Sequence, residues 1–140
     1  MPNRRTILIL DDEPAVLAIS SLVLLAYGFE VLPAASAKEA REQFNRSGNQ
    51  NDLLIADVAL PGASGVDVAL QCSAHSPTLG VIITSGSPPD VWSDWDRTTF
   101  GRLLSSRVTY LEKPFTPARL LRAVNSVLGP PEELSRAAFV

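Results

Sequence analysis

The sequence predicts a doubly wound α/β domain built on a five-stranded parallel sheet with helices on both faces. Three observations lead to this prediction: short apolar runs recur along the chain, segments with helical patterns separate them, and polar residues end several of the runs. Alternation of strands and helices favours a parallel sheet, and right-handed crossovers place helices on both of its faces. The chain has 140 residues, which suits one domain of this kind.

Five segments are expected as strands. Four are almost continuously apolar, as burial on both faces of a parallel sheet requires, and the fifth alternates as an edge strand does. The four buried strands are expected at 6–10, 52–56, 80–84 and 108–111, and the edge strand at 29–33.

Apolar periodicity and residues typical of helix ends indicate four helices, which are the first, second, third and fifth of the predicted fold. They are expected at 14–26, 36–44, 65–74 and 117–128. Gly28 suits the end of the first helix, and Ser36 with Glu39 matches a capping box at the start of the second. Thr116 is the expected N-cap of the last helix, with Pro117 at its first position.

The segment 85–106, SGSPPDVWSDWDRTTFGRLLSS, lies where a fourth helix should follow the fourth strand. Its prolines, Gly101 and several Ser and Thr residues make it a poor helix former, so we expect an irregular or shortened fourth helix. Trp92, Trp95 and Phe100 are expected to cover apolar surface of the sheet rather than to bind a ligand.

Composition limits the classes of function. The net charge of −3 gives no reason to expect direct binding to nucleic acid, and no apolar run approaches the length of a membrane span. The single cysteine, Cys72, excludes an internal disulfide and is compatible with a reducing, cytoplasmic location. The N-terminus lacks the cleavage site of a signal peptide. We expect one domain over 1–128, followed at 129–140 by a short tail or the start of a linker.

Polar residues collect at the predicted carboxyl ends of four strands, where ligands bind to open parallel sheets. They are Asp11 and Asp12 after the first strand, Asp57 after the third, Thr84 and Ser85 after the fourth, and Glu112 and Lys113 after the fifth. Two carboxylates roughly 4 Å apart repel by on the order of 4 kcal/mol at an effective dielectric near 20. A divalent cation would offset this repulsion, and Mg²⁺ is the natural choice for oxygen ligands.

A carboxylate beside Mg²⁺ can act as a nucleophile toward phosphorus and form an aspartyl phosphate. Asp57 is the candidate acceptor because it stands alone at its strand end, whereas Asp11 and Asp12 are candidate metal ligands. Lys113 and the Ser85 hydroxyl would contact the oxygens of the transferred group. Glu13 is expected as a free surface acid at the start of the first helix, where the helix dipole favours it.

The segments ILILDDEP, DLLIADVALPGASG, VIITSG and YLEKPF, in this order and spacing, resemble the receiver domain of two-component response regulators. The resemblance covers roughly residues 5 to 128. It implies a flavodoxin-like fold with strand order 2-1-3-4-5 and a phosphorelay function, in which the chain accepts a phosphoryl group and switches its interaction surface. Such a domain catalyses only its own phosphorylation and dephosphorylation, so no other enzyme activity is expected.

The resemblance implies roles for the acidic residues. Asp57 matches the phosphoacceptor of the family. Asp12 matches a direct Mg²⁺ ligand, and Asp11 one that acts largely through water. The backbone carbonyl of Ala59 matches a further protein ligand to the metal.

It implies roles for the remaining site residues as well. Ser85 matches the family hydroxyl, Lys113 matches the family lysine, and a cis peptide bond is implied before Pro114. Tyr110 matches the aromatic residue that turns inward when the hydroxyl moves to the phosphoryl group. The fourth helix, fifth strand and fifth helix should then form the surface that changes. The chain departs from the family pattern there, because 85–113 is longer than usual and lacks an alanine-rich helix.

The implied partners are a sensor histidine kinase or phosphotransfer protein as phosphoryl donor and an unidentified downstream protein. Direct contact with nucleic acid or membrane is not expected, and a homodimer is left open. Two alternatives remain. A degenerate receiver acting only as a protein-interaction module is slightly favoured by the unusual segment 86–107. An Mg²⁺-dependent phosphatase would also use a nucleophilic aspartate, but Ala59 stands where its second acid would be.

Overall fold

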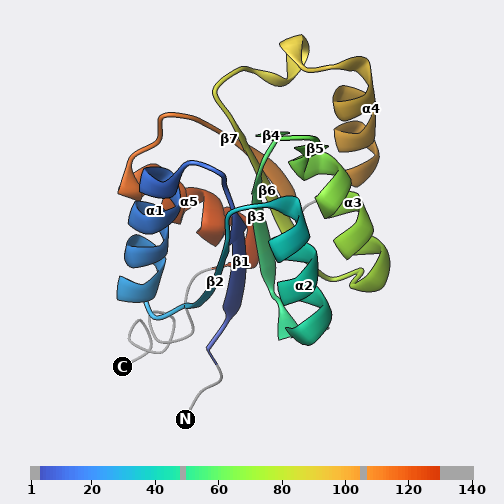
Figure 1. The fold of residues 1–140 in the computed structure, drawn as a ribbon. Helices are drawn as coiled ribbons and strands as arrows, with labels where there is room; N and C mark the ends of the chain where they lie inside the picture. The colour runs from blue at the N-terminus through green and yellow to red at the C-terminus, as the bar shows by residue number, and fades with distance from the viewer. Residues whose placement is uncertain (1–3, 48–49, 105–106, 130–140) are drawn as a thin grey trace.

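The computed structural model describes residues 4–47, 50–104 and 107–129. It confirms the parallel sheet, whose five strands lie in the order β2-β1-β3-β6-β7 (Figure 1). This is the expected order 2-1-3-4-5, since β6 and β7 are the fourth and fifth long strands along the chain. The strands are β1 (Thr6–Leu10), β2 (Glu30–Ala34), β3 (Leu53–Asp57), β6 (Gly80–Ser85) and β7 (Val108–Glu112).

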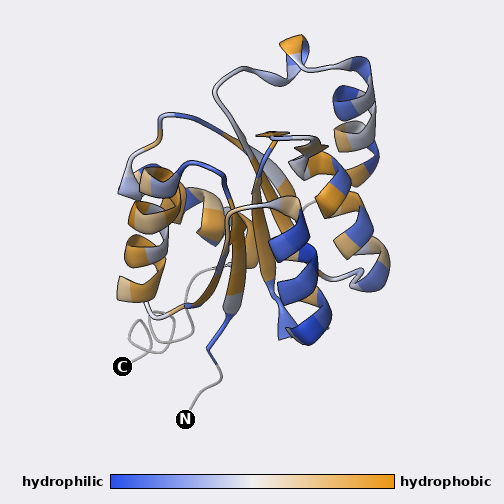
Figure 2. Ribbon diagram, viewed as in Figure 1, coloured by the Kyte–Doolittle hydropathy of each residue, from blue (hydrophilic) through white to orange (hydrophobic). Residues whose placement is uncertain are grey.

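The central strands bury side chains on both faces, which explains their continuous apolar runs. In β1, Ile7 and Ile9 belong to one apolar cluster, whereas Leu8 and Leu10 belong to the cluster on the other face. β3 and β6 alternate in the same way. Figure 2 shows the result, with apolar colour along the central strands and a hydrophilic surface on α2.

Helices cover both faces, as expected. The helices are α1 (Pro14–Ala26), α2 (Ala37–Ser47), α3 (Gly65–His75), α4 (Asp94–Leu103) and α5 (Pro117–Leu128). α1 and α5 lie on one side of the sheet and α2 and α3 on the other (Figure 1). Within the described ranges, no helix combines the length and apolar character needed to cross a membrane.

The residues predicted to end or begin helices are found at those helix ends in the structure. Gly28, with φ of +90°, follows the last turn of α1, and the Thr116 hydroxyl accepts the Arg119 N–H at 3.2 Å to cap α5. At α2 the Ser36 hydroxyl accepts the Glu39 N–H, as in a capping box, but the Glu39 carboxylate reaches the Ala35 N–H instead of that of Ser36.

The loop after β3 contains a small antiparallel hairpin that the sequence did not predict. Its strands, β4 (Ala59–Leu60) and β5 (Ala63–Ser64), have two residues each. Gly62, with φ of +66°, allows the tight turn between them. The hairpin delivers the chain from Asp57 directly into α3.

The fourth helix is short, as expected, and follows a single 3₁₀ turn at Pro89–Val91. Trp92 and Phe100 are buried on the sheet side, as predicted, but the prediction is wrong for Trp95. Trp95 is 60% exposed, and its indole N–H donates to the Asp67 carboxylate of α3 at 2.7 Å. α4 therefore rests against α3. The expected tail at 129–140 lies outside the described residues except for Gly129, which ends α5.

Candidate functional site

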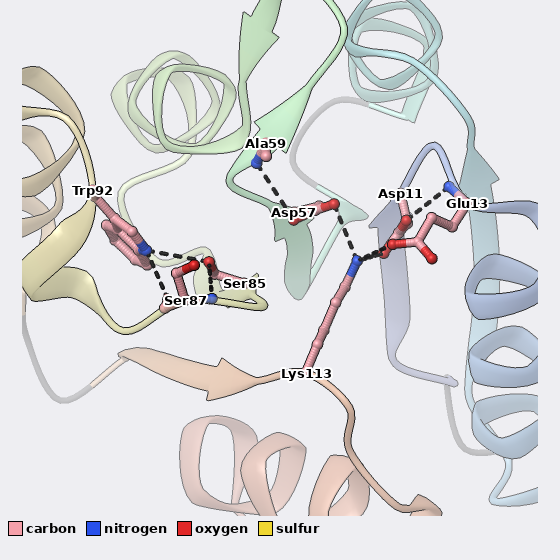
Figure 3. Close-up of polar contacts among 8 residues, drawn as sticks. All are labelled: Asp11, Glu13, Asp57, Ala59, Ser85, Ser87, Trp92 and Lys113. Carbon is pink, nitrogen blue, oxygen red and sulfur yellow. Dashed lines mark hydrogen bonds and ion pairs between the residues drawn. The ribbon is translucent and has the colours of Figure 1, made fainter.

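The ends of four parallel strands bring the expected polar residues together at one edge of the sheet (Figure 3). Asp11 follows β1, Asp57 ends β3, Ser85 ends β6 and Lys113 follows β7. The strand register aligns them, because Asp57 pairs with Thr84 and the Lys113 N–H donates to the Ser85 carbonyl at 2.8 Å.

Lys113 is the cation at the centre of this site. Its Nζ atom lies 2.7 Å from Asp11 Oδ2, 3.1 Å from Asp57 Oδ2 and 3.3 Å from Glu13 Oε1. The lysine side chain is 13% exposed, and those of Asp11 and Asp57 are 4% and 8% exposed. One partly buried ammonium thus contacts two buried carboxylates.

Asp11, Asp12 and Asp57 form a group that can hold a metal ion. One carboxylate oxygen from each residue lies within 4.8 Å of those of the other two. Asp11 and Asp57 are buried, whereas Asp12 is exposed. Three clustered carboxylate oxygens are the donors that hard divalent cations prefer, so the residues present fit such an ion.

The site has more buried negative charge than Lys113 balances. Burial raises the pKa of Asp57 above its ordinary value; contact with Lys113 opposes this rise and the charge of Asp11 adds to it. Burial alone would lower the pKa of Lys113, but its contacts with Asp11 and Asp57 raise it above the ordinary value. The lysine therefore remains an ammonium. The two buried carboxylates carry one more negative charge than it neutralises, and a bound cation could balance this charge.

Asp57 has one further contact within its own loop. The Ala59 N–H lies 3.4 Å from Asp57 Oδ1, a long hydrogen bond. Ala59 thus sits beside the carboxylate, at the start of β4. On the other side of the site, the peptide bond between Lys113 and Pro114 is cis.

The Ser85 hydroxyl binds away from the carboxylates. Its oxygen accepts the Ser87 N–H at 3.0 Å and the Trp92 indole N–H at 3.2 Å. Tyr110 lies on the same side, where its hydroxyl donates to the Ser87 carbonyl at 3.3 Å. In Figure 3 Lys113 points toward Asp57, whereas Ser85 points toward Trp92.

Two residues of this site were not assigned to it from the sequence. Glu13 was expected to be free, but it contacts Lys113. Its position next to Asp11 and Asp12 was a usable signal. Trp92 donates a hydrogen bond to Ser85 from the far end of an irregular loop. No periodic pattern in the sequence predicts a contact of this kind.

Known proteins share this sequence pattern. The sequence model of the response regulator receiver domain matches residues 7–125. The chain is 28% identical over 123 residues to the sensory transduction protein RegX3 of Mycolicibacterium smegmatis, covering 88% of this chain and 50% of that protein. It is 29% identical over 125 residues to the sensor kinase CckA of Brucella abortus, covering 88% of this chain and 12% of that protein.

Solved structures share the fold. A crystal structure of a response regulator receiver protein from Sinorhizobium medicae WSM419 superposes with a TM-score of 0.74 and 27% sequence identity, covering 91% of this chain and 97% of that one. The chain spans about half the length of RegX3. Because the family match extends over most of the sequence, this chain belongs to the response regulator receiver family.

Proposed function

We propose that this chain is a phosphorelay receiver that accepts a phosphoryl group on Asp57 and then changes what it binds. The observation that carries the proposal is the position of Lys113, whose ammonium bridges Asp57 and Asp11 within a cluster of three aspartates. This arrangement supplies a nucleophile, a cation for the transferred group and a set of metal ligands in one place.

In the proposed reaction a carboxylate oxygen of Asp57 attacks phosphorus while the bond from phosphorus to the donor's imidazole nitrogen breaks. The imidazole leaves with that electron pair. The Lys113 ammonium, now 3.1 Å from Asp57 Oδ2, is close enough to move onto an oxygen of the incoming group. Charge-assisted hydrogen bonds of this kind are among the strongest available to phosphate. Ser85 would donate its hydroxyl proton to another phosphoryl oxygen.

The metal proposed for this site is Mg²⁺, held by Asp11, Asp12, Asp57 and the backbone carbonyl of Ala59. When bound, it would neutralise charge on the phosphoryl oxygens during transfer. Asp12 is the residue we expect to bind it directly, since its carboxylate is exposed. Asp11 already engages Lys113 and would act largely through water.

The proposed donor is a protein, namely a sensor histidine kinase or a phosphotransfer protein, in the cytoplasm. α1 begins next to the acidic residues and exposes a row of large apolar side chains: Ile19, Leu22 and Leu25 are 59%, 67% and 51% exposed. Figure 2 shows this helix as apolar along its length. Such a surface beside a reaction site supports docking of a partner protein. The downstream partner and any homodimer would use other faces.

The proposed function is tested with acetyl phosphate or with beryllofluoride, each with Mg²⁺, followed by intact mass and ¹⁹F NMR. We expect one adduct per chain. Asp57→Asn should abolish it, whereas Asp90→Asn should leave it unchanged, because Asp90 is an exposed residue of the 3₁₀ turn before α4.

Two other outcomes would overturn the proposal. Absence of any adduct in the wild type would leave a protein-interaction module. Rapid, continuous hydrolysis of acetyl phosphate with no accumulated adduct would indicate a phosphatase instead.

Magnesium should stabilise the unphosphorylated protein, because it relieves repulsion among Asp11, Asp12 and Asp57. At one hundred times its dissociation constant the gain is about 2.7 kcal/mol, which corresponds to roughly 5–10 °C in melting temperature. Asp12→Ala should be slightly more stable than the wild type without metal and should lose most of the magnesium effect. Asp90→Ala serves as the control. A melting temperature that ignores MgCl₂, compared with NaCl at equal ionic strength, would contradict this prediction.

A further inference from the structure

The Ser85 hydroxyl is held on the side of Trp92. Its oxygen accepts two hydrogen bonds, from the Ser87 N–H at 3.0 Å and from the Trp92 indole N–H at 3.2 Å. Ser85 is 4% exposed, so water does not readily replace these partners. Figure 3 shows Trp92 and Lys113 on opposite sides of Ser85, with the hydroxyl directed to the tryptophan. In this state the Ser85 hydroxyl contacts Ser87 and Trp92 rather than Asp57.

Trp92 also fills the space beside Tyr110. The indole is 9% exposed and makes edge-on contacts with Tyr110, at 5.8 Å between ring centres, and with Phe100, at 5.3 Å. Both Trp92 and Tyr110 donate to the Ser87 carbonyl. The indole and Tyr110 therefore share the space next to Ser87, and it is the indole that contacts Ser85.

We propose that Trp92 is a positioning residue that holds Ser85 away from Asp57 in the unphosphorylated protein. Trp92 must be displaced when Asp57 is phosphorylated. This inference rests on the proposed phosphorelay function. It adds an obstacle to the expected movement of Tyr110, and the obstacle comes from the segment in which this chain departs from its family.

Release of Ser85 would cost Trp92 little. The indole N–H is shared between two acceptors, and the Ser87 carbonyl is the nearer one, at 2.9 Å. When the Ser85 hydroxyl turns to donate to a phosphoryl oxygen, the indole still has this partner. The hydrogen bond that restrains Ser85 is therefore weak and can break and re-form, as a switch requires, while the packing of the indole on Phe100 and Tyr110 favours its return.

The movement should be largest in the segment that carries Trp92 and should reach α4 through the contact of Trp92 with Phe100. α4 is tied to the start of α3 by two hydrogen bonds of 2.7 Å, from the Ser64 hydroxyl to Asp96 and from the Trp95 indole to Asp67. The segment 86–93 has only a single 3₁₀ turn and is drawn as a long excursion above the sheet in Figure 1. Trp92 thus lies in the part expected to move most, whereas the surroundings of Trp95 are held by contacts with α3.

This difference allows each tryptophan to report on its own region. In Trp95→Phe, the emission of Trp92 should change on addition of beryllofluoride with Mg²⁺, in parallel with adduct formation followed by ¹⁹F NMR. In Trp92→Phe, the emission of Trp95 should change much less through the same titration. In the double variant Ser85→Ala with Trp95→Phe, the Trp92 emission should be altered before addition. It should no longer respond at beryllofluoride concentrations at which ¹⁹F NMR shows that the adduct has formed.

Affinity gives a second readout. Trp92→Phe keeps an aromatic ring but removes the N–H, so it should bind beryllofluoride about fivefold more tightly, as expected for loss of one neutral hydrogen bond that restrains the free state. Trp95→Phe should stay within twofold of the wild type. An adduct that forms with no change in Trp92 emission, or a Trp92→Phe variant that binds no more tightly, would overturn the inference alone. Absence of an adduct in every protein would overturn the proposed function with it.

Should Trp92→Phe fold poorly, as a melting temperature would show, the fluorescence of the Ser85→Ala double variant still decides the question. That protein retains Trp92 and its packing against Phe100 and Tyr110. A Trp92 emission that responds to the adduct equally with and without the Ser85 hydroxyl would contradict the proposed restraint.

Discussion

Replacing Lys113 with methionine should slow phosphorylation by acetyl phosphate about a hundredfold or more, the usual cost of removing one group that stabilises developing negative charge. Methionine keeps an unbranched side chain only one heavy atom shorter and removes the ammonium. In the described part of the chain, Lys113 is the cation paired with Asp11, Glu13 and Asp57. The variant therefore loses both the group that meets the phosphoryl oxygens and the counter-charge of the resting site.

The same substitution should also destabilise the unphosphorylated protein at neutral pH by about 3 kcal/mol, because the buried carboxylates of Asp11 and Asp57 lose their cation. The loss should depend on pH. Burial raises the pKa of Asp57 above 3.8, and without Lys113 it rises further. A carboxyl group with a raised folded-state pKa makes stability fall as pH rises from its unfolded pKa through the folded one. The gap between wild type and variant should thus be small near pH 4 and grow toward pH 7.

The control for Lys113 is Lys38→Met, which removes the same charge from an exposed position on α2. Urea unfolding at several pH values, without metal, measures stability, and intact mass measures phosphorylation. A Lys113→Met protein that is phosphorylated within threefold of the wild-type rate would show that the ammonium has no part in the transfer. A stability gap that does not change with pH would contradict the electrostatic account.

The sheet and most of the site were predictable because their signals are periodic and local. Continuous apolar runs mark strands buried on both faces, and the first polar residue after each run falls at the same edge of the sheet. These two signals alone predict that Asp11, Asp57, Ser85 and Lys113 lie at one site. The helix ends at Gly28 and Thr116 follow from local backbone requirements of the same kind.

Other features depend on contacts between distant parts of the chain, which local patterns do not encode. The β4–β5 hairpin has too few residues per strand to show alternation. The contact of Glu13 with Lys113 depends on the conformation of two long side chains. Trp92 and Trp95 look alike in sequence, yet one is buried against Ser85 and the other is exposed and bound to Asp67. Tertiary partners decided between them.

Gly65→Ala should be the most damaging small substitution near the site. A Cβ atom at this position would overlap the backbone oxygen of Asp57, lie 2.8 Å from its carbonyl carbon and lie 3.1 Å from the Ala56 Cβ. Backbone atoms cannot rotate away as a side chain can. The hairpin returns the chain so closely to Asp57 that only glycine fits, although the conformation of Gly65 itself is an ordinary one.

We expect Gly65→Ala to lose about 3 kcal/mol or more of unfolding free energy, the upper end of the range for adding a methyl group to a packed interior. In a domain of this size that corresponds to roughly 10 °C in melting temperature. The clash also pushes on the residue that we propose as phosphoacceptor. Protein that remains folded at low temperature should therefore bind beryllofluoride at least tenfold more weakly, because the Asp57 carboxylate shifts from Lys113 and from the other aspartates.

Gly101→Ala is the matched control, since it adds the same methyl group inside α4 with no atom within 4 Å. Alanine favours a helix interior over glycine by about 0.5–1 kcal/mol, so this variant should be slightly more stable than the wild type and should bind beryllofluoride normally. Opposite signs for the two substitutions would show that the close approach of α3 to Asp57 fixes the geometry of the acceptor. Equal and small effects would mean that the hairpin can move aside, and that the acceptor is held by Lys113 and the sheet alone.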